Sequence, residues 1–190
     1  MSPKLKKQIG FGLIELMVSV SILAIVFGIV LTRQTAFNGA VLLRSQAYEI
    51  ALALREVQMS SVNAGGLAGE YRYSRGIFFD NSSLADNQYQ PFQDNDGDYF
   101  YDLGEDFGPT YFLDDKFEVR EFNVYGDTMT GSQLSVVFQR PNFDAIFYDD
   151  SGRLNASRVE VVVSVRGETG SDVGDIKLIE ITSTGQIDVK

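Results

Sequence analysis

The feature that most constrains this chain is an uninterrupted apolar run near its N-terminus. The run extends from Phe11 to Leu31, and Glu15 is the one charged residue inside it. As an α-helix it would measure about 31 Å, which is roughly the thickness of the hydrocarbon core of a bilayer. Three lysines precede the run and Arg33 stands just beyond it. This asymmetry predicts a cytoplasmic N-terminus and an exported C-terminus.

Two simple interpretations of the run leave something unexplained. A secretory signal peptide has an apolar region of about 7–15 residues followed by a small-residue cleavage site. This run is longer, and no Ala-x-Ala pattern follows it. A plain signal anchor explains the length and the lysines, but it does not explain Glu15. Because a carboxylate inside an apolar span is costly, such a residue usually marks a function.

The residues around Glu15 support a more specific interpretation. A basic leader ends in Gly10, the next residue is Phe11, and Glu15 is the fifth residue of the chain that begins at Phe11. This pattern resembles the leader junction of type IV pilins and type II secretion pseudopilins, over about residues 6–31. The residues that carry the resemblance are Gly10-Phe11-Gly12-Leu13-Ile14-Glu15-Leu16.

The resemblance implies how the chain is processed and assembled. A prepilin peptidase is expected to cleave after Gly10 and to N-methylate Phe11. The other expected partners are further pilin or pseudopilin subunits and the lipid of the inner (cytoplasmic) membrane. In a filament, the Glu15 carboxylate can pair with the free amine of a neighbour's Phe11 and set the register, because either charge alone is costly in an apolar bundle. A tolerated interfacial Glu is the alternative interpretation.

Helical periodicity continues beyond the apolar run. Apolar residues recur at spacings of four and three, no Pro interrupts residues 11–64, and Gly65-Gly66 follows as a stop signal. The sequence therefore predicts one helix of about 80 Å over 11–64, with an amphipathic second half that needs a partner surface. The apolar stripe consists of Ala36, Ala40, Leu43, Ala47, Ile50, Leu54 and Val57.

From Gly65 onward the periodicity is that of β-strands. Val159, Val161, Val163 and Val165 alternate along one strand. The other expected strands are 117–125, 134–139, 143–148, 176–182 and 186–189, with a turn at 149–152, a C-terminal hairpin turn at 183–185 and an edge strand at 71–79. The predicted fold class is α+β, an antiparallel sheet packed on the helix. The predicted parts are a leader at 1–10, the helix at 11–64 (11–31 transmembrane and filament core) and a β-rich head at 65–190.

Composition excludes several functional classes for these 190 residues. They include no Cys, His or Trp, so this chain cannot form disulfides, thiolate nucleophiles, His-based triads or Cys/His zinc sites. The formal net charge is −10, from 16 Lys and Arg against 26 Asp and Glu, which disfavours nucleic-acid binding. No spacing singles out a catalytic pair among the acids, so no enzymatic activity is expected.

An acidic segment matches the spacing of a calcium-binding loop. Residues 76–115 contain ten acids and no Lys or Arg. Within them, carboxylates stand at loop positions 1, 3, 5, 9 and 12, and a backbone carbonyl is available at position 7. Position 6 normally holds Gly, but here it is Tyr99, for which a positive φ is unusual; Gly97 and Gly104 are alternative places for the turn. The predicted Ca²⁺ ligands are Asp94, Asp96, Asp98, Phe100, Asp102 and Glu105. A solvated loop without an ion is the alternative.

The leading functional expectation is a non-enzymatic subunit of a type IV filament. A likeness to H-type minor pseudopilins of type II secretion rests on residues 136–141 and 181–187. The alternative is a membrane-anchored, calcium-dependent binding module or adhesin that uses the aromatic side chains of the acidic loop, although such side chains more often form the loop's own small core. These side chains are Tyr89, Phe92, Tyr99, Phe100, Tyr101, Phe107, Tyr111 and Phe112.

Overall fold

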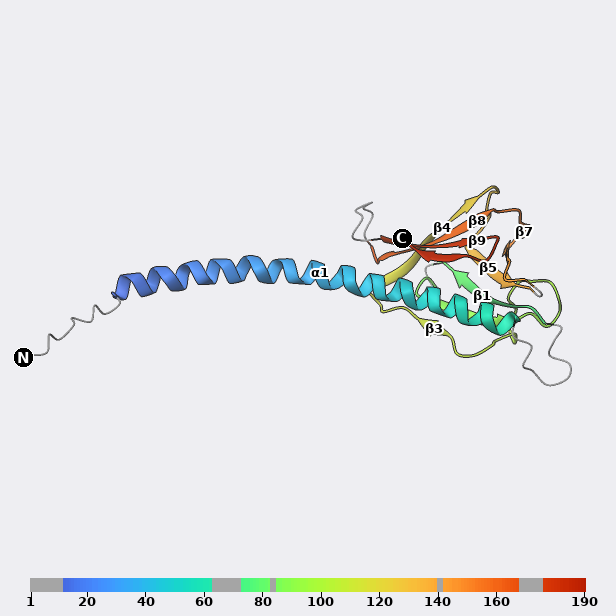
Figure 1. Ribbon diagram of the computed structural model, residues 1–190, viewed down its shortest axis with the longest axis horizontal. Helices are drawn as coiled ribbons and strands as arrows, with labels where there is room; N and C mark the ends of the chain where they lie inside the picture. The colour runs from blue at the N-terminus through green and yellow to red at the C-terminus, as the bar shows by residue number, and fades with distance from the viewer. Residues whose placement is uncertain (1–11, 63–72, 83–84, 140–141, 168–175) are drawn as a thin grey trace, which may run out of the picture. The chain divides into compact units, whose positions relative to one another are not determined.

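The computed structural model describes residues 12–62, 73–82, 85–139, 142–167 and 176–190, with the side chains of residues 32–38 left out. The chain divides into two compact units, Met1–Gly39 and Ala40–Lys190. Among the described residues, the helix α1 (Leu13–Val62) extends through both units, and the strands lie in the second (Figure 1).

The first part of α1 is apolar on every side. The segment Leu13–Leu31 has a mean hydropathy of 2.6 and none of it is buried, so it is long and apolar enough to cross a membrane. Ser19 and Ser21 donate hydroxyl hydrogen bonds of 2.8 Å to the carbonyls of Glu15 and Met17, four residues earlier. These hydroxyl groups are therefore satisfied within the helix itself.

The second part of α1 contributes one face to the hydrophobic core of the second unit. The buried residues of the predicted stripe are Leu43, Ala47, Ile50, Leu54 and Val57. Ala40 is half-buried, and the side chain of Ala36 lies outside the described residues. The amphipathic pattern is confirmed for the described part of the stripe, and the helix is described as far as Val62. The Gly65-Gly66 stop signal also falls outside the described residues.

The larger sheet is antiparallel and has the strand order β3-β2-β1-β5-β6-β7. Its strands are β1 (Arg75–Asp80), β2 (Gln88–Gln93), β3 (Tyr111–Phe112), β5 (Gln133–Phe138), β6 (Ala145–Asp149) and β7 (Gly152–Leu154). Ile77, Val136 and Phe147 are cross-strand neighbours on one face, and they belong to the same buried core as the helix stripe. This face of the sheet therefore packs toward α1.

The smaller sheet is also antiparallel, with the order β10-β9-β8-β4. Its strands are β4 (Phe117–Tyr125), β8 (Arg158–Val165), β9 (Ile176–Thr182) and β10 (Ile187–Val189). The alternating valines of β8 are confirmed, because Val159, Val161 and Val163 are completely buried. The predicted hairpin is also confirmed. The Gly185 amide donates to the Thr182 carbonyl at 2.8 Å, and Gly185 has the positive φ that such a turn requires.

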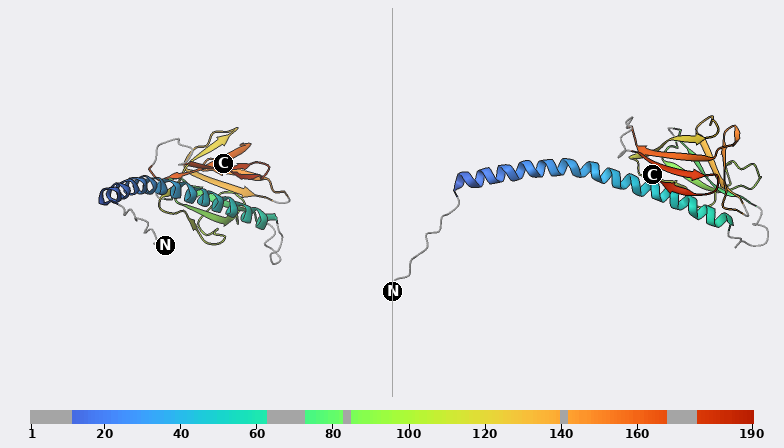
Figure 2. Two further views of the ribbon diagram at one scale, coloured as in Figure 1. Left: turned by 60° about the vertical axis from the view of Figure 1, so that its left-hand side comes forward. Right: turned by 45° about the horizontal axis from the view of Figure 1, so that its top comes forward.

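Polar contacts connect the second part of α1 to both sheets. The Gln58 amide donates to the carbonyls of Phe143 (2.9 Å) and Gly185 (2.8 Å), and Arg55 donates to the carbonyl of Ile187 in β10 (3.0 Å). The Ser61 hydroxyl donates to the carbonyl of Phe138 in β5. Figure 2 shows this part of α1 running alongside the strands. The two sheets thus supply the partner surface that the amphipathic pattern of the helix requires.

The structure confirms the α+β class and corrects the arrangement of the strands. The strands form two sheets where one was predicted. The strand predicted at 71–79 is β1, which lies between β2 and β5 and is not an edge strand. Sequence patterns missed β2 because Pro91 interrupts it. The Pro91 carbonyl accepts a hydrogen bond from the Phe107 amide, on the side away from β1, so the missing N–H does not weaken the β1–β2 ladder.

Candidate functional site

The predicted processing site shortly precedes α1 in the sequence. Gly10 and Phe11 fall outside the described residues, whereas Glu15 stands in the first turn of the helix. The helical hydrogen-bond pattern is already present here, because the Leu16 amide donates to the Gly12 carbonyl at 3.1 Å. Within the described part of the chain, the Glu15 carboxylate is exposed and has no hydrogen-bond partner. A carboxylate in the first turn is favoured by the helix dipole.

The acidic loop is closed by hydrogen bonds between the two chain segments that flank it. The Gln93 amide donates to the Glu105 carbonyl at 2.8 Å, and the Phe107 amide donates to the Pro91 carbonyl at 2.9 Å. Residues 105–107 therefore run antiparallel to the end of β2. This pairing brings Asp94 and Glu105, the first and twelfth positions of the predicted calcium loop, to the same place in the fold. Both side chains are buried there.

Carboxylate-to-backbone hydrogen bonds fold the first half of the loop. An Asp94 oxygen accepts from the Gly97 amide at 2.6 Å, and an Asp98 oxygen accepts from the Phe100 amide at 2.8 Å. Tyr99, the sixth position, has a φ of 67°. This is the left-handed conformation that Gly supplies at the same position of a calcium loop. Gly97 also has a positive φ, but the turn at the sixth position is made by Tyr99 itself.

The structure brings three of the six predicted ligands together. One carboxylate oxygen from each of Asp94, Asp96 and Asp98 lies within 4.8 Å of the others. Among the described residues, Asp102 and Glu105 do not belong to this group, and the two Glu105 oxygens accept hydrogen bonds from the amides of Asn95 (2.7 Å) and Asp102 (3.2 Å).

The electrostatics of the loop disfavour the bare carboxylates. Burial, followed by the charges of Asp96 and Asp98, raises the pKa of Asp94 against the lowering effect of its backbone hydrogen bonds. Burial and the charges of Asp96 and Asp94 likewise raise the pKa of Glu105. Burial, the hydrogen bond to Asp106 and the neighbouring negative charges raise the pKa of Tyr101 to about 12. A cation beside these groups would reverse the unfavourable effect of their charges.

The aromatic side chains of the loop cover part of the second face of the larger sheet. Tyr99 stacks on Tyr148 of β6 with ring centroids 5.4 Å apart. Phe100 meets Phe78 of β1 edge-to-face at 5.8 Å, and Tyr101 lies 4.9 Å from the same Phe78 ring. The α1 core therefore covers one face of the larger sheet, and the loop covers part of the other, where Phe78 and Tyr148 are half-buried. Sequence reasoning found these loop aromatics but missed their partners Phe78 and Tyr148.

Most of the remaining aromatic residues are also packed. Phe92 is completely buried against Tyr101, and Tyr89 stacks on Tyr111 at 5.3 Å. Phe112, which is 65% exposed, is the exception. The arrangement agrees with the interpretation that these side chains form a small core of the loop, and it leaves few of them available to a ligand.

The comparisons with known proteins match the N-terminal segment. The family described as the prokaryotic N-terminal methylation motif matches residues 5–31. Neither the curated proteins nor the solved structures gave a match to this chain. The matched residues include Gly10, Phe11 and Glu15, and they contain the membrane-length part of α1, Leu13–Leu31. The chain therefore carries the N-terminal signature of the type IV pilin and pseudopilin family.

Proposed function

We propose that the protein is a non-enzymatic subunit of a type IV filament, and most specifically a minor pseudopilin of a type II secretion system. It is inserted in the inner membrane with its head exported, cleaved after Gly10 by a prepilin peptidase, and N-methylated at Phe11. The observation that carries this proposal is the methylation motif at residues 5–31, which covers the helix start and an apolar segment of membrane length.

The chemistry of Glu15 supports a role in assembly. Its carboxylate is exposed in the first turn of an otherwise apolar helix segment. Once helices pack against one another, an unpaired carboxylate becomes very costly, and the free amine of a neighbouring Phe11 is a suitable partner. Pairing at this position favours one axial register of neighbouring subunits over the others.

A second apolar stripe on α1 also supports assembly through the helix. Val41, Tyr48, Leu52 and Met59 follow one another at spacings of seven, four and seven, so they share one side of the helix. Their side chains are 49–67% exposed, unlike the core residues on the opposite side. A stripe at heptad-like spacing is suited to packing against helices of other subunits.

The N-terminus of the mature protein tests the processing step. Mass spectrometry of the membrane-bound protein from a host with a prepilin peptidase is expected to show N-methylated Phe11 as the first residue. A matched host without the peptidase is expected to retain Met1–Gly10. An intact Met1 in both hosts, or cleavage beyond Leu31, would contradict the proposal. Neighbouring genes distinguish the machines, because a secretion pseudopilus requires a secretin and a secretion ATPase, whereas a retractile pilus requires a retraction ATPase.

We also propose that the acidic loop binds Ca²⁺. The residues fit such an ion, because three carboxylates converge within 4.8 Å and Tyr99 has the positive φ of the sixth loop position. Asp94, Asp96, Asp98, Asp102, Glu105 and the Phe100 carbonyl would supply the oxygen ligands that Ca²⁺ prefers. The ion would offset the repulsion among these carboxylates and stabilise the loop against the sheet. A calcium titration, described in the Discussion, tests this proposal.

A further inference from the structure

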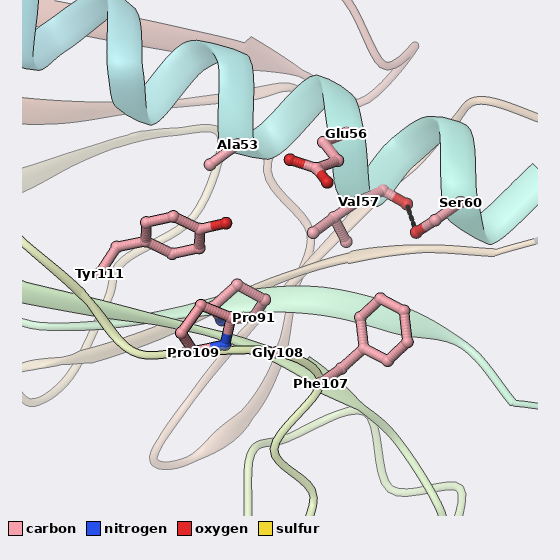
Figure 3. Close-up of a pocket in the computed structure, with 9 residues that line it drawn as sticks. All are labelled: Ala53, Glu56, Val57, Ser60, Pro91, Phe107, Gly108, Pro109 and Tyr111. Atoms are coloured by element: carbon pink, nitrogen blue, oxygen red, sulfur yellow. Dashed lines mark hydrogen bonds between the residues drawn. The ribbon is translucent and has the colours of Figure 1, made fainter.

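A pocket opens between α1 and the edge of the larger sheet. It has a volume of about 330 Å³. Its residues are Ala53, Glu56, Val57 and Ser60 of α1, Pro91 of β2, Phe107, Gly108 and Pro109 of the connecting loop, and Tyr111 of the edge strand β3 (Figure 3). This volume is near the lower limit of ligand pockets, roughly 300–1,000 Å³, and suits one or two side chains.

The walls of the pocket are mainly apolar, and they carry one acidic group. In Figure 3, the Glu56 side chain points from α1 toward Pro91 and Pro109, with Tyr111 and Phe107 on either side. Glu56 is exposed to solvent, and within the described residues its carboxylate has no hydrogen-bond or ion-pair partner. The pocket therefore combines apolar contact surface with an available negative charge.

The guanidinium of Arg75, which lies over the pocket residue Phe107, is already engaged in other contacts. Arg75 lies over the Phe107 ring, 4.0 Å from its centroid, and donates hydrogen bonds of 3.2 Å to the Ser60 carbonyl and to Gln93. These contacts hold the Phe107 ring in place as a wall of the pocket. Among the described residues, Glu56 takes part in none of the ion pairs.

We propose that this pocket binds an extended, proline-containing segment of a different protein and places an Arg or Lys of that segment beside Glu56. Extended proline-rich segments dock in grooves lined by aromatic side chains, and Phe107 and Tyr111 line this pocket. Charge selects the partner. Residues 65–190 contain 10 Lys and Arg against 23 Asp and Glu, so a second copy of this chain would bring a head of the same sign. A basic partner is complementary, and its cationic side chain can lay its apolar stem along the walls.

Methyl NMR of the mature chain in detergent micelles tests this proposal. The probe is the peptide Leu-Pro-Pro-Arg-Pro-Leu at up to millimolar concentration. It is expected to shift the methyl signals of Ala53 and Val57, which line the pocket, and not those of Val163 in β8. The same peptide with Glu in place of Arg is expected to bind more weakly. Equal binding of the two peptides, or no shift of the pocket methyl groups, would overturn the proposal.

Two variants of the exposed Glu56 test the contribution of its charge to peptide binding. Glu56→Gln is expected to weaken binding of the Arg peptide by up to about fivefold, the range for a partly exposed ion pair. Glu56→Lys is expected to prefer the Glu peptide. The control is Glu49→Gln, which neutralises an exposed acid two turns earlier on the same helix, outside the pocket, and should leave both affinities unchanged. An equal effect of Glu49→Gln and Glu56→Gln would contradict the assigned role of Glu56.

Discussion

Tyr99 and Tyr148 stack with their ring centroids 5.4 Å apart and an angle of 26° between the rings. Tyr99 makes this contact from a backbone with a φ of 67°, which is unfavourable for a side chain of its size. The stack holds the turn of the acidic loop against β6, and it offsets the conformational cost of that turn. The same pair therefore connects the loop's backbone geometry to the burial of the sheet.

Because the stacked contact of Tyr99 is favourable and its backbone conformation is unfavourable, we expect an unusual order of stability for substitutions at this position. Tyr99→Ala loses the stacked contact but keeps the left-handed backbone, and should be destabilised by about 1 kcal/mol. Tyr99→Gly also loses the contact, but it removes the backbone strain of about 1–2 kcal/mol. We therefore expect the Gly variant to be more stable than the Ala variant by about 1 kcal/mol, as measured by urea unfolding of the chain in detergent.

Leu103 is the matched control for this comparison. Its side chain is 97% exposed, and it is not among the described residues with positive φ. At such a position Gly adds conformational freedom to the unfolded chain, so Leu103→Ala should be more stable than Leu103→Gly by about 0.4–1 kcal/mol. If Ala and Gly rank in the same order at both positions, Tyr99 does not hold a left-handed turn in solution.

Calcium should stabilise the folded chain through the acidic loop. An ion that binds the native state alone stabilises it by about 2.7 kcal/mol at a concentration of 100 times its Kd. We therefore expect millimolar CaCl₂ to raise the melting temperature of the mature protein, and EDTA to reverse the shift. Asp96→Ala should abolish the response, because it removes one of the three convergent carboxylates.

The control for the calcium experiment is Asp188→Ala. This variant removes an exposed acid from β10, away from the loop, and should retain the full calcium response. A melting temperature that does not change with calcium in the wild-type protein would favour a solvated acidic loop. If both variants lose the calcium-dependent rise in melting temperature equally, calcium acts by general screening of the negative head and does not bind at a specific site.

The sequence predicted the helix and most of the strands because their periodicity is local. The stripe from Leu43 to Val57 and the valines of β8 depend on spacing within one element, and the structure confirms both. The division into two sheets depends on which strands pair across the fold, and no single segment contains that information. β3 has two residues and β2 contains Pro91, so neither carries a strand pattern that could have been recognised.

The sequence predicted which residues form the candidate site better than it predicted the contacts among them. The spacing of Asp94, Asp96 and Asp98 is visible in the sequence, and the structure brings them together. Tyr99 adopts the positive φ of the sixth position, and it stacks on Tyr148, which lies 49 positions further along the chain. The spacing of residues in the loop gives no sign of this contact. The pocket beside Glu56 arises where α1 meets β2 and β3, so its residues share no sequence motif.

Asp149 should make stability depend on acid pH. Burial alone would raise the pKa of this carboxyl, but hydrogen bonds from Ser151 and Thr130 outweigh that effect and lower it. A carboxylate with a lowered pKa stabilises the fold above the pKa of the unfolded chain, about 3.9, and loses this contribution as the pH falls through its folded value. Asp149→Asn should cost about 1–3 kcal/mol at pH 7, and the difference should narrow below pH 4.

Urea unfolding at a series of pH values measures this difference. Asp150 responds in the opposite direction, because burial and the charge of Asp149 raise its pKa, and Asp149→Asn removes the part of that shift that comes from Asp149. Comparing the wild type with Asp149→Asn therefore measures the charge of Asp149 together with its effect on Asp150. A difference in unfolding free energy that stays constant from pH 7 to pH 3 would show that the carboxylate charge makes no contribution.

Glu15→Val should separate membrane insertion from filament assembly. The variant removes the one charge in the apolar segment, so insertion should be unchanged or improved. Loss of the expected pair with a neighbour's Phe11 amine should prevent the subunit from entering filaments. Membrane fractionation and recovery of sheared filaments measure the two steps, with Glu49→Val as the control on the same helix. Normal filament entry of Glu15→Val would exclude a role in register.

Leu52→Glu should impair assembly without unfolding the protein. The Leu52 side chain is 67% exposed in the middle of the second apolar stripe, so a charge there should change the unfolding free energy by less than about 0.5 kcal/mol. In a filament the same charge would be buried between helices, where an unpaired carboxylate costs several kcal/mol. Leu103→Glu, which adds the same charge in the loop, should assemble normally. If Leu52→Glu subunits enter filaments as readily as Leu103→Glu subunits, this stripe faces solvent in the assembled state and the helix packs through another side.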